Sequence, residues 1–303
     1  MLVWLNGRVL DARAARVSAL DRGLLHGDGV YDTWRTYGGR PFLTHAHVAR
    51  LARAARALGL PSPGPAAAWA ARARRLVARN ALPDAAVRLT LTRGAAGDAL
   101  APARRVPPTL LLTARPLPPD LPARQARGAG AILLPFPRDC GPPWGATKLV
   151  GHASAVVGRT LAARAGADEG LYVAAGGRVT EATAANVFCV ERGTLVTPPA
   201  DGTILAGVTR EKVLALAHRA GLRVREEPIP VARLRGAAEV FLTSATIEVL
   251  PVVRLDGRRL GDGRPGAVTR VLQARYAAWV AARLPHEARG RRRTFPPRVA
   301  GSG

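Results

Sequence analysis

Residues 148–210 read KLVGHASAVVGRTLAARAGADEGLYVAAGGRVTEATAANVFCVERGTLVTPPADGTILAGVTR, and this stretch decides how the rest of the chain is interpreted. It begins at Lys148, one of only two lysines among the 45 Lys and Arg residues. Where arginine supplies nearly every positive charge, a retained lysine is a candidate for chemistry that arginine cannot perform. A guanidinium stays protonated, whereas a lysine amine can lose its proton and attack a carbonyl carbon. The other lysine, Lys212, opens a predicted helix and is expected at the surface.

Apolar periodicity and turn residues predict a mixed α/β chain of the α+β type on both sides of Lys148. An Asn6-Gly7 turn predicts a hairpin within residues 1–10. The expected helices cover residues 45–58, 66–79, 150–165, 209–220 and 264–284. The expected strands cover residues 30–37, 85–92, 108–114, 131–135, 170–173, 186–190, 240–243 and 250–254.

The proline-rich residues 116–129 predict a linker between two domains. A small N-terminal domain would cover residues 1–115, and a larger C-terminal domain would cover residues 130–285. Residues 286–303 are basic and are expected to be a disordered tail.

Composition excludes several classes of protein. A 303-residue chain that is 48% hydrophobic can bury a sizeable core, and no apolar run reaches the roughly 18 residues of a membrane span. The N-terminus lacks the features of a signal peptide, and Cys140 and Cys189 lack metal-ligand spacing, which predicts a cytoplasmic protein with reduced thiols and no metal. The net charge of +24 is spread over predicted helices without a nucleic-acid motif, so no specific nucleic-acid partner and no membrane is expected.

Several motifs around Lys148 together could bind a phosphorylated aldehyde. Glu181 directly precedes a predicted strand, and the residues Gly207-Val208-Thr209-Arg210 open a predicted helix whose free amides can bind an anion. The turn Ser244-Ala245-Thr246 offers more amides, and Arg50 can pair with a phosphate in a bidentate manner. A lysine, a carboxylate for a pyridine nitrogen and an anion site are what pyridoxal phosphate requires. Taken singly, each feature is commonplace; their order along the chain is not.

That order resembles the class IV aminotransferases, the pyridoxal phosphate enzymes of fold type IV. The family includes branched-chain aminotransferases, D-amino-acid aminotransferases and aminodeoxychorismate lyases. The resemblance covers about residues 3–276. The motifs that carry it are DRGLLHGDGVY, HVARL, the lysine at 148, GRVTEATAANVF, GTLVTPP, ILAGVTR, and EVFLTSATIEVLPV followed by LDGRRLGDGRPG.

The resemblance implies two α/β domains, with pyridoxal phosphate in the cleft between them, in a homodimer. Lys148 would attach the cofactor covalently and carry a proton during turnover, and Glu181 would face the pyridine nitrogen. Tyr31 would lie on the substrate side of the site. The residues that would hold the phosphate are Arg50, Val208, Thr209, Ala245 and Thr246.

The chain departs from each subgroup in a way that bears on substrate. Some relatives have a hydroxyl residue where Ala245 stands, and branched-chain enzymes have a tyrosine in the run after the lysine that is missing after Lys148. The Arg-x-His carboxylate trap of D-amino-acid enzymes is absent after Thr92-Arg93-Gly94. Arg88 stands where branched-chain enzymes place a carboxylate-binding arginine.

These comparisons favour a transaminase that moves an amino group between a branched-chain-like L-amino acid and a 2-oxo acid. Two alternatives stay open. The run EATAANVF resembles aminodeoxychorismate lyases, which release pyruvate and 4-aminobenzoate. A D-amino-acid or amine transaminase would use the same cofactor and the same lysine.

Overall fold

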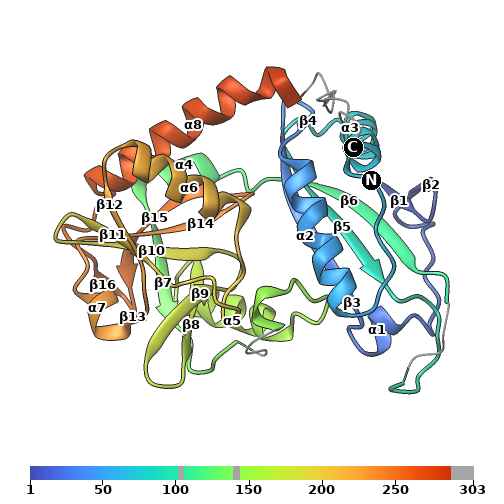
Figure 1. The fold of residues 1–303 in the computed structure, drawn as a ribbon, viewed down its shortest axis with the longest axis horizontal. Helices are drawn as coiled ribbons and strands as arrows, with labels where there is room; N and C mark the ends of the chain where they lie inside the picture. Colours follow the sequence, from blue (N-terminus) through green and yellow to red (C-terminus); the bar gives the residue numbers. More distant parts are fainter. Residues whose placement is uncertain (102–105, 139–143, 288–303) are drawn as a thin grey trace, which may run out of the picture.

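The structure is a computed structural model that describes residues 1–101, 106–138 and 144–287. Cys140 and residues 288–303 of the predicted tail lie outside the described residues. The chain forms two β-sheets, which stand side by side in Figure 1 with helix α8 (Ala267–Glu287) running above both. No helix in the described ranges is long and apolar enough to cross a membrane.

The N-terminal sheet is antiparallel and has the strand order β2-β1-β6-β5-β3-β4. Its strands are β1 (Leu2–Leu5), β2 (Arg8–Asp11), β3 (Gly29–Tyr37), β4 (Arg40–Pro41), β5 (Ala85–Thr92) and β6 (Thr109–Pro116). Asn6 and Gly7 take positive φ angles of 45° and 97° in the turn between β1 and β2, so the predicted hairpin is confirmed.

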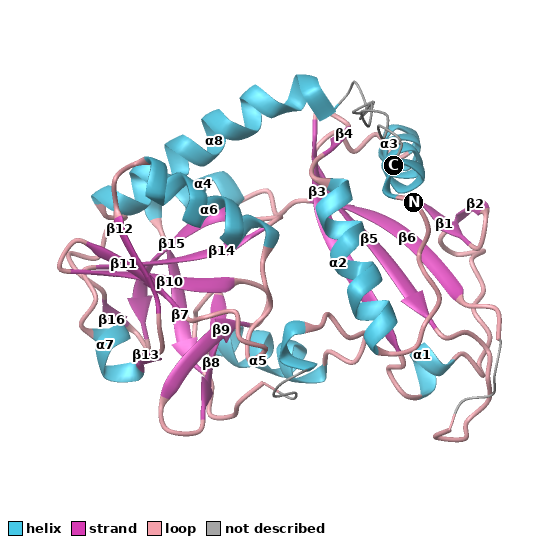
Figure 2. Ribbon diagram, viewed as in Figure 1, coloured by secondary structure: helices cyan, strands magenta, loops and turns pink. Residues whose placement is uncertain are grey.

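In the described part of the chain, two helices cover one face of this sheet. They are α2 (Thr44–Ala57) and α3 (Ala66–Arg79), while the short α1 (Arg22–Leu25) precedes β3. Their apolar stripes pack on the sheet in a core that includes Trp34, Leu51 and Trp69 (Figure 2). Because neighbouring residues of a strand point to opposite faces, Tyr31 and Thr33 of β3 face away from these helices, toward the other sheet.

The C-terminal sheet has the order β12-β11-β10-β14-β15-β7-β8-β9-β13, with β16 paired to β15. Its strands are β7 (Ala129–Leu133), β8 (Glu169–Ala174), β9 (Arg178–Ala182), β10 (Asn186–Glu191), β11 (Thr194–Thr197), β12 (Arg223–Glu226), β13 (Ile229–Pro230), β14 (Glu239–Ser244), β15 (Glu248–Leu255) and β16 (Arg258–Arg259). Helices α6 (Val208–Arg219) and α8 pack on it through a cluster that includes the stacked rings of Phe188 and Phe241. The other helical segments of this part are η1 (Trp144–Ala146), α5 (Ala153–Arg164) and α7 (Val231–Arg235).

The predicted linker, residues 116–129, contains the helix α4 (Leu121–Arg127). Proline is compatible with the first turn of a helix, because the amide it lacks would have no partner there. Leu121 is buried, and Arg124 forms ion pairs with Asp120 at 3.0 Å and Asp168 at 3.5 Å. The segment between the two sheets is therefore an ordered, packed element.

The helix predicted over residues 150–165 begins three residues later than expected, at Ala153. The cause is a β-bridge between Leu149 and Val30 of strand β3. The amide of Tyr31 donates to the carbonyl of Lys148 at 2.9 Å, and the amide of Val150 donates to the carbonyl of Gly29 at 2.9 Å. Residues 148–150 thus lie as an extra strand segment against the N-terminal sheet.

Candidate active site

A cavity of about 260 Å³ lies between the two sheets. All nine residues predicted for the site line it, from both halves of the chain. They are Tyr31, Arg50, Arg88, Lys148, Glu181, Val208, Thr209, Ala245 and Thr246. Folding therefore gathers these side chains around one space, although more than 200 residues separate the first from the last.

Lys148 enters the cavity from the strand segment that pairs with β3. Its main chain is held by the Tyr31 amide, and its Nζ lies 4.9 Å from the centre of the Tyr31 ring. Gly27, with a φ of +64°, packs against this segment so closely that a Cβ there would lie 3.0 Å from the Cα of Gly151. The glycine-rich motif before β3 therefore allows the close approach that sets the position of Lys148.

Glu181, on β9, is 5% exposed and forms a polar cluster at one side of the cavity. Arg138 donates to its Oε1, and its Oε2 accepts from the amide of Leu205 at 3.1 Å and from Asn186 Nδ2 at 3.3 Å. Burial raises the pKa of Glu181, and the charge of Arg138 opposes that rise. The sequence argument did not identify Arg138, which is one of many arginines in the chain and acquires its partner only through folding.

The first turn of α6 lies at the cavity, where the sequence predicts an anion site. Its N-cap is Gly207, and the cap makes no side-chain hydrogen bond within the described structure, so the amides of Val208 and Thr209 face the cavity without a capping side chain. A Cβ on Gly207 would lie 2.0 Å from Asn186 Oδ1, so any other residue would have to push the Asn186 side chain aside. Thr243 contributes a buried hydroxyl that lacks a hydrogen-bond partner in the described residues and also lines the cavity.

Arg50 reaches the same end of the cavity from α2. Two of its guanidinium nitrogens bind the carboxylate of Asp32, on strand β3 of the N-terminal sheet. Its Nε and Nη2 each donate to Asp32 at 2.8 Å, and its Nη1 donates to the carbonyl of Ala206 at 3.0 Å. His47 also contacts Asp32, at 2.9 Å. The phosphate contact predicted for Arg50 stays a prediction, and Asp32 takes two of the donors that a bidentate contact would use.

Asp32 is fully buried, and its negative charge is balanced by this arginine. Burial alone would raise its pKa, but the neighbouring Arg50 and His47 outweigh burial, and the pKa of Asp32 falls below its usual value. Burial lowers the pKa of His47, which favours the neutral ring. Sequence reasoning missed both Asp32 and His47, although the run VYDTWRTY places Asp32 beside the predicted Tyr31.

The remaining wall is formed by β3 and β5. Arg88 is paired with Thr33 in register, and its Cζ lies over the Tyr31 ring, 3.6 Å from the ring centre. The hydroxyl of Tyr31 forms a 2.6 Å hydrogen bond with Nε2 of His152, which lies at the start of α5. Arg115 of β6 also lines the cavity. This side of the site is cationic and suits a carboxylate.

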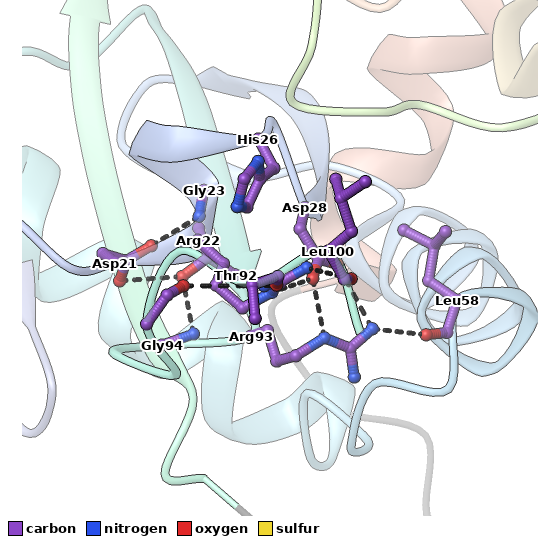
Figure 3. Close-up of polar contacts among 12 residues, drawn as sticks. Asp21, Arg22, Gly23, His26, Asp28, Leu58, Thr92, Arg93, Gly94 and Leu100 are labelled. Atoms are coloured by element: carbon purple, nitrogen blue, oxygen red, sulfur yellow. Dashed lines mark hydrogen bonds and ion pairs between the residues drawn. The ribbon is translucent and has the colours of Figure 1, made fainter. Parts of the chain in front are cut away.

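Beside the cavity, a second polar network secures the segment before β3 and the loop after β5 (Figure 3). Asp28 accepts from Arg22 Nε at 2.8 Å and from Arg93 Nε at 2.7 Å. Arg22 also binds the carbonyl of Leu100 at 2.9 Å, and Arg93 binds the carbonyl of Leu58 at 2.7 Å. These contacts hold loop backbone in place and take no part in lining the cavity.

Comparisons with known proteins agree with this geometry. The sequence model described as amino-transferase class IV matches residues 29–255, a range that includes every residue lining the cavity. A protein named as a putative branched-chain-amino-acid aminotransferase of Methanocaldococcus jannaschii is 34% identical over 276 residues, covering 91% of this chain and 95% of that protein. The D-alanine aminotransferase of Bacillus licheniformis is 33% identical over 282 residues, covering 90% and 95%.

A solved structure gives the same result for the fold. The branched-chain aminotransferase of the archaeon Thermoproteus uzoniensis, with norvaline, has a TM-score of 0.84 at 28% identity, covering 93% of this chain and 95% of that chain. Another branched-chain amino acid aminotransferase, solved with pyridoxamine 5'-phosphate, has the same TM-score and identity and covers 95% and 96%. This chain belongs to the class IV aminotransferases, an enzyme family, and the predicted family and fold are confirmed.

Proposed function

We propose that the chain is a pyridoxal phosphate-dependent transaminase that moves an amino group between an amino acid and a 2-oxo acid. The observation that carries the proposal is the convergence of Lys148, Glu181 and the first turn of α6 on one cavity. A branched-chain-like L-amino acid is the favoured substrate, since Arg88 lies in the cavity wall beside Tyr31.

The residues present fit this cofactor. Its phosphate needs donors. The amides of Val208 and Thr209 and the hydroxyl of Thr243, which have no side-chain cap and no hydrogen-bond partner, respectively, among the described residues, would supply them. Its pyridine nitrogen needs a carboxylate that is shielded from solvent, and Glu181 is such a buried carboxylate. Its aldehyde needs an amine, and Lys148 is the only lysine among the residues that line the cavity.

When bound, pyridoxal phosphate supplies an electrophilic carbonyl and a ring that accepts electrons. Glu181 would hold a proton at the pyridine nitrogen, and its contacts with Arg138 and Asn186 would keep its carboxylate in place. The Lys148 amine would attach the cofactor and, when free, would move the proton of the substrate Cα. Arg88 and Tyr31 would orient the substrate carboxylate.

Borohydride reduction of cofactor-loaded protein, followed by peptide mapping, tests the assignment of Lys148. We expect the mass of the reduced cofactor on the peptide that carries Lys148. Lys148→Ala should lose turnover by several orders of magnitude while its thermal unfolding stays close to that of the wild type. The matched control is Lys212→Ala, because Lys212 pairs with Glu211 at 2.5 Å on the surface and should keep full activity. Label on Lys212 with Lys148 unmodified would contradict the proposal.

A D-amino-acid transaminase is the second candidate, because D-alanine aminotransferases are about as similar to this chain as the branched-chain enzyme. A panel of L- and D-amino acids, scored by the absorbance change of the cofactor in a single half-reaction, separates the two. A response to D-alanine with none to L-leucine or L-valine would replace the favoured substrate class. Release of pyruvate from aminodeoxychorismate without a 2-oxo acid would instead indicate the lyase.

The expected quaternary state and location belong to the same proposal. We expect a cytoplasmic homodimer, and light scattering should give twice the 31.8 kDa mass of the chain.

A further inference from the structure

The hydrogen bond between Tyr31 and His152 is a feature of the site that the reaction as described does not use. The two residues come from different halves of the chain, and their contact spans the cavity wall at 2.6 Å between Oη and Nε2. Their rings lie 5.4 Å apart at an angle of 58°, so the imidazole meets the hydroxyl at its edge rather than stacking on the phenol.

Other contacts fix the positions of both Tyr31 and His152. The amide of Tyr31 is bound to the carbonyl of Lys148, and its ring lies under the guanidinium of Arg88. His152 is the N-cap residue of α5, and its carbonyl accepts from the amide of Val156 at 3.2 Å. The hydrogen bond therefore joins two residues whose main chains are held in place.

The direction of this hydrogen bond decides what the phenol can offer to a ligand. If Nε2–H of His152 donates to the Tyr31 oxygen, the phenol O–H is left to donate to something in the cavity. A donated hydrogen bond also polarises the phenol and strengthens its own donation. The cavity wall here includes the guanidinium groups of Arg88 and Arg115, so an anion is the ligand that such a donor would meet.

We propose that His152 is a positioning residue, which donates to Tyr31 and so directs the phenol O–H toward the carboxylate of the substrate beside Arg88. This proposal rests on the proposed transaminase function, in which His152 would help to bind the carboxylate of the substrate. His152 acts through Tyr31 and does not itself contact the reacting atoms.

A double-mutant cycle on cofactor-loaded protein tests the proposal, with 4-methylvaleric acid as an unreactive carboxylate probe and calorimetry as the readout. Tyr31→Phe and His152→Phe should each weaken binding of the probe by about tenfold, the size of one hydrogen bond to a charged group. The double variant should also lose about tenfold, since either change alone already removes the contact. His152→Gln, which keeps a donor at similar reach, should stay within about threefold of the wild type.

Three results would overturn the proposal: losses that multiply to about a hundredfold in the double variant, unchanged binding in His152→Phe, or no binding of the probe to loaded wild-type protein. Thr160→Ala is the matched control, because Thr160 lies on the same helix and borders a neighbouring cavity that His152 also lines. It should bind the probe as the wild type does.

The same preparations separate this proposal from the proposed function. Borohydride mapping of each variant reports whether Lys148 carries the cofactor before any probe is added. Absence of label on wild-type Lys148 counts against the transaminase assignment. Normal labelling with independent effects of the two substitutions counts against the role of His152 alone.

Discussion

Asp32 shows how one buried carboxylate can organise a cationic site. It is inaccessible to solvent and binds Arg50 through both oxygens, while His47 adds a third contact. Arg50 is thereby presented to the cavity in one orientation, with Nη1 against the carbonyl of Ala206 in the other half of the chain. The pair costs desolvation free energy but becomes strongly destabilising only when one partner is lost.

We therefore expect Asp32→Asn to lower the free energy of unfolding by about 3 kcal/mol at pH 7, because the guanidinium of Arg50 would stay buried without its counter-charge. It should also weaken cofactor binding. Urea denaturation measures the first effect and absorbance titration the second. Asp120→Asn is the matched control, because Asp120 pairs with Arg124 while 55% exposed and should change stability by less than about 1 kcal/mol.

The pH dependence of this difference follows from the lowered pKa of Asp32. A carboxylate with a lowered pKa stabilises the folded state above its unfolded pKa, near 4, and loses that contribution as the pH falls toward the folded pKa. The stability gap between wild type and Asp32→Asn should thus be constant above about pH 5 and narrow below about pH 4. A gap that widens on acidification would contradict the ion-pair account.

Single residues were predictable from sequence where their type is rare and unpredictable where it is common. Lys148 stands out in a chain with only two lysines, and the family motifs marked Glu181 and Thr209. Arg138 and Asp32 have no such signal, because their roles depend on partners far along the chain. Cys189 is a free thiol whose pKa burial raises to about 12, which keeps it protonated, as a reduced core cysteine should be.

The N-cap of helix α6 links the proposed phosphate site to Glu181. Gly207 approaches Asn186 so closely that a methyl group there would displace the Asn186 side chain. Asn186 Nδ2 binds both Glu181 at 3.3 Å and the carbonyl of Leu205 at 2.8 Å. The start of the helix and the orientation of Glu181 therefore depend on the same glycine.

Gly207→Ala should displace Asn186 and weaken cofactor binding by about tenfold, roughly the loss of 1.4 kcal/mol. The measurement is a titration of cofactor-free protein with pyridoxal phosphate, followed by absorbance. Gly236→Ala serves as its control, because a Cβ there would meet only backbone oxygens at 3.6 Å or more, an ordinary contact distance, and Gly236 follows α7 away from the cavity. Equal affinity in the two variants would refute the role of Gly207.

Apolar periodicity predicted the bounds of a helix or strand correctly where the residues that determine those bounds lie within the element itself. Helix α3 and strand β5 have the bounds that periodicity indicated. The late start of α5 and the existence of α4 were missed for a common reason. Residues 148–150 join a distant strand, and α4 forms where Leu121 and Arg124 find partners outside the segment, which propensity within a window cannot register.

The two sheets are joined by contacts above the cavity as well as around it. The ring of Phe42, just after β4, packs edge-on against Trp279 of α8 at 5.4 Å and against Tyr37 at 5.3 Å. Glu248 of β15 accepts from Arg35 at 2.9 Å and from Tyr37 at 2.6 Å. The apolar and polar contacts of this junction thus join the N-terminal sheet to β15 and α8.

Phe42→Ala should reduce the free energy of unfolding by about 3 kcal/mol, the usual cost of deleting a buried aromatic ring. Because the lost ring bridges the two sheets, we expect one calorimetric transition in the wild type and two in the variant. Leu112→Ala, a deletion inside the N-terminal sheet, should lower the transition temperature without splitting the peak. Identical peak shapes in both variants would show that the junction does not couple the sheets.

The bridge between Leu149 and Val30 has a mechanical consequence. It ties the main chain next to Lys148 to the N-terminal sheet, whereas Glu181 and the first turn of α6 belong to the C-terminal part. A rigid-body rotation of one sheet against the other would move the Lys148 amine away from Glu181 and the first turn of α6, without any change inside either sheet. The position of Lys148 relative to Glu181 and α6 thus depends on the interface between the two sheets. We expect substitutions far from the Lys148 amine to alter activity when they shift that interface.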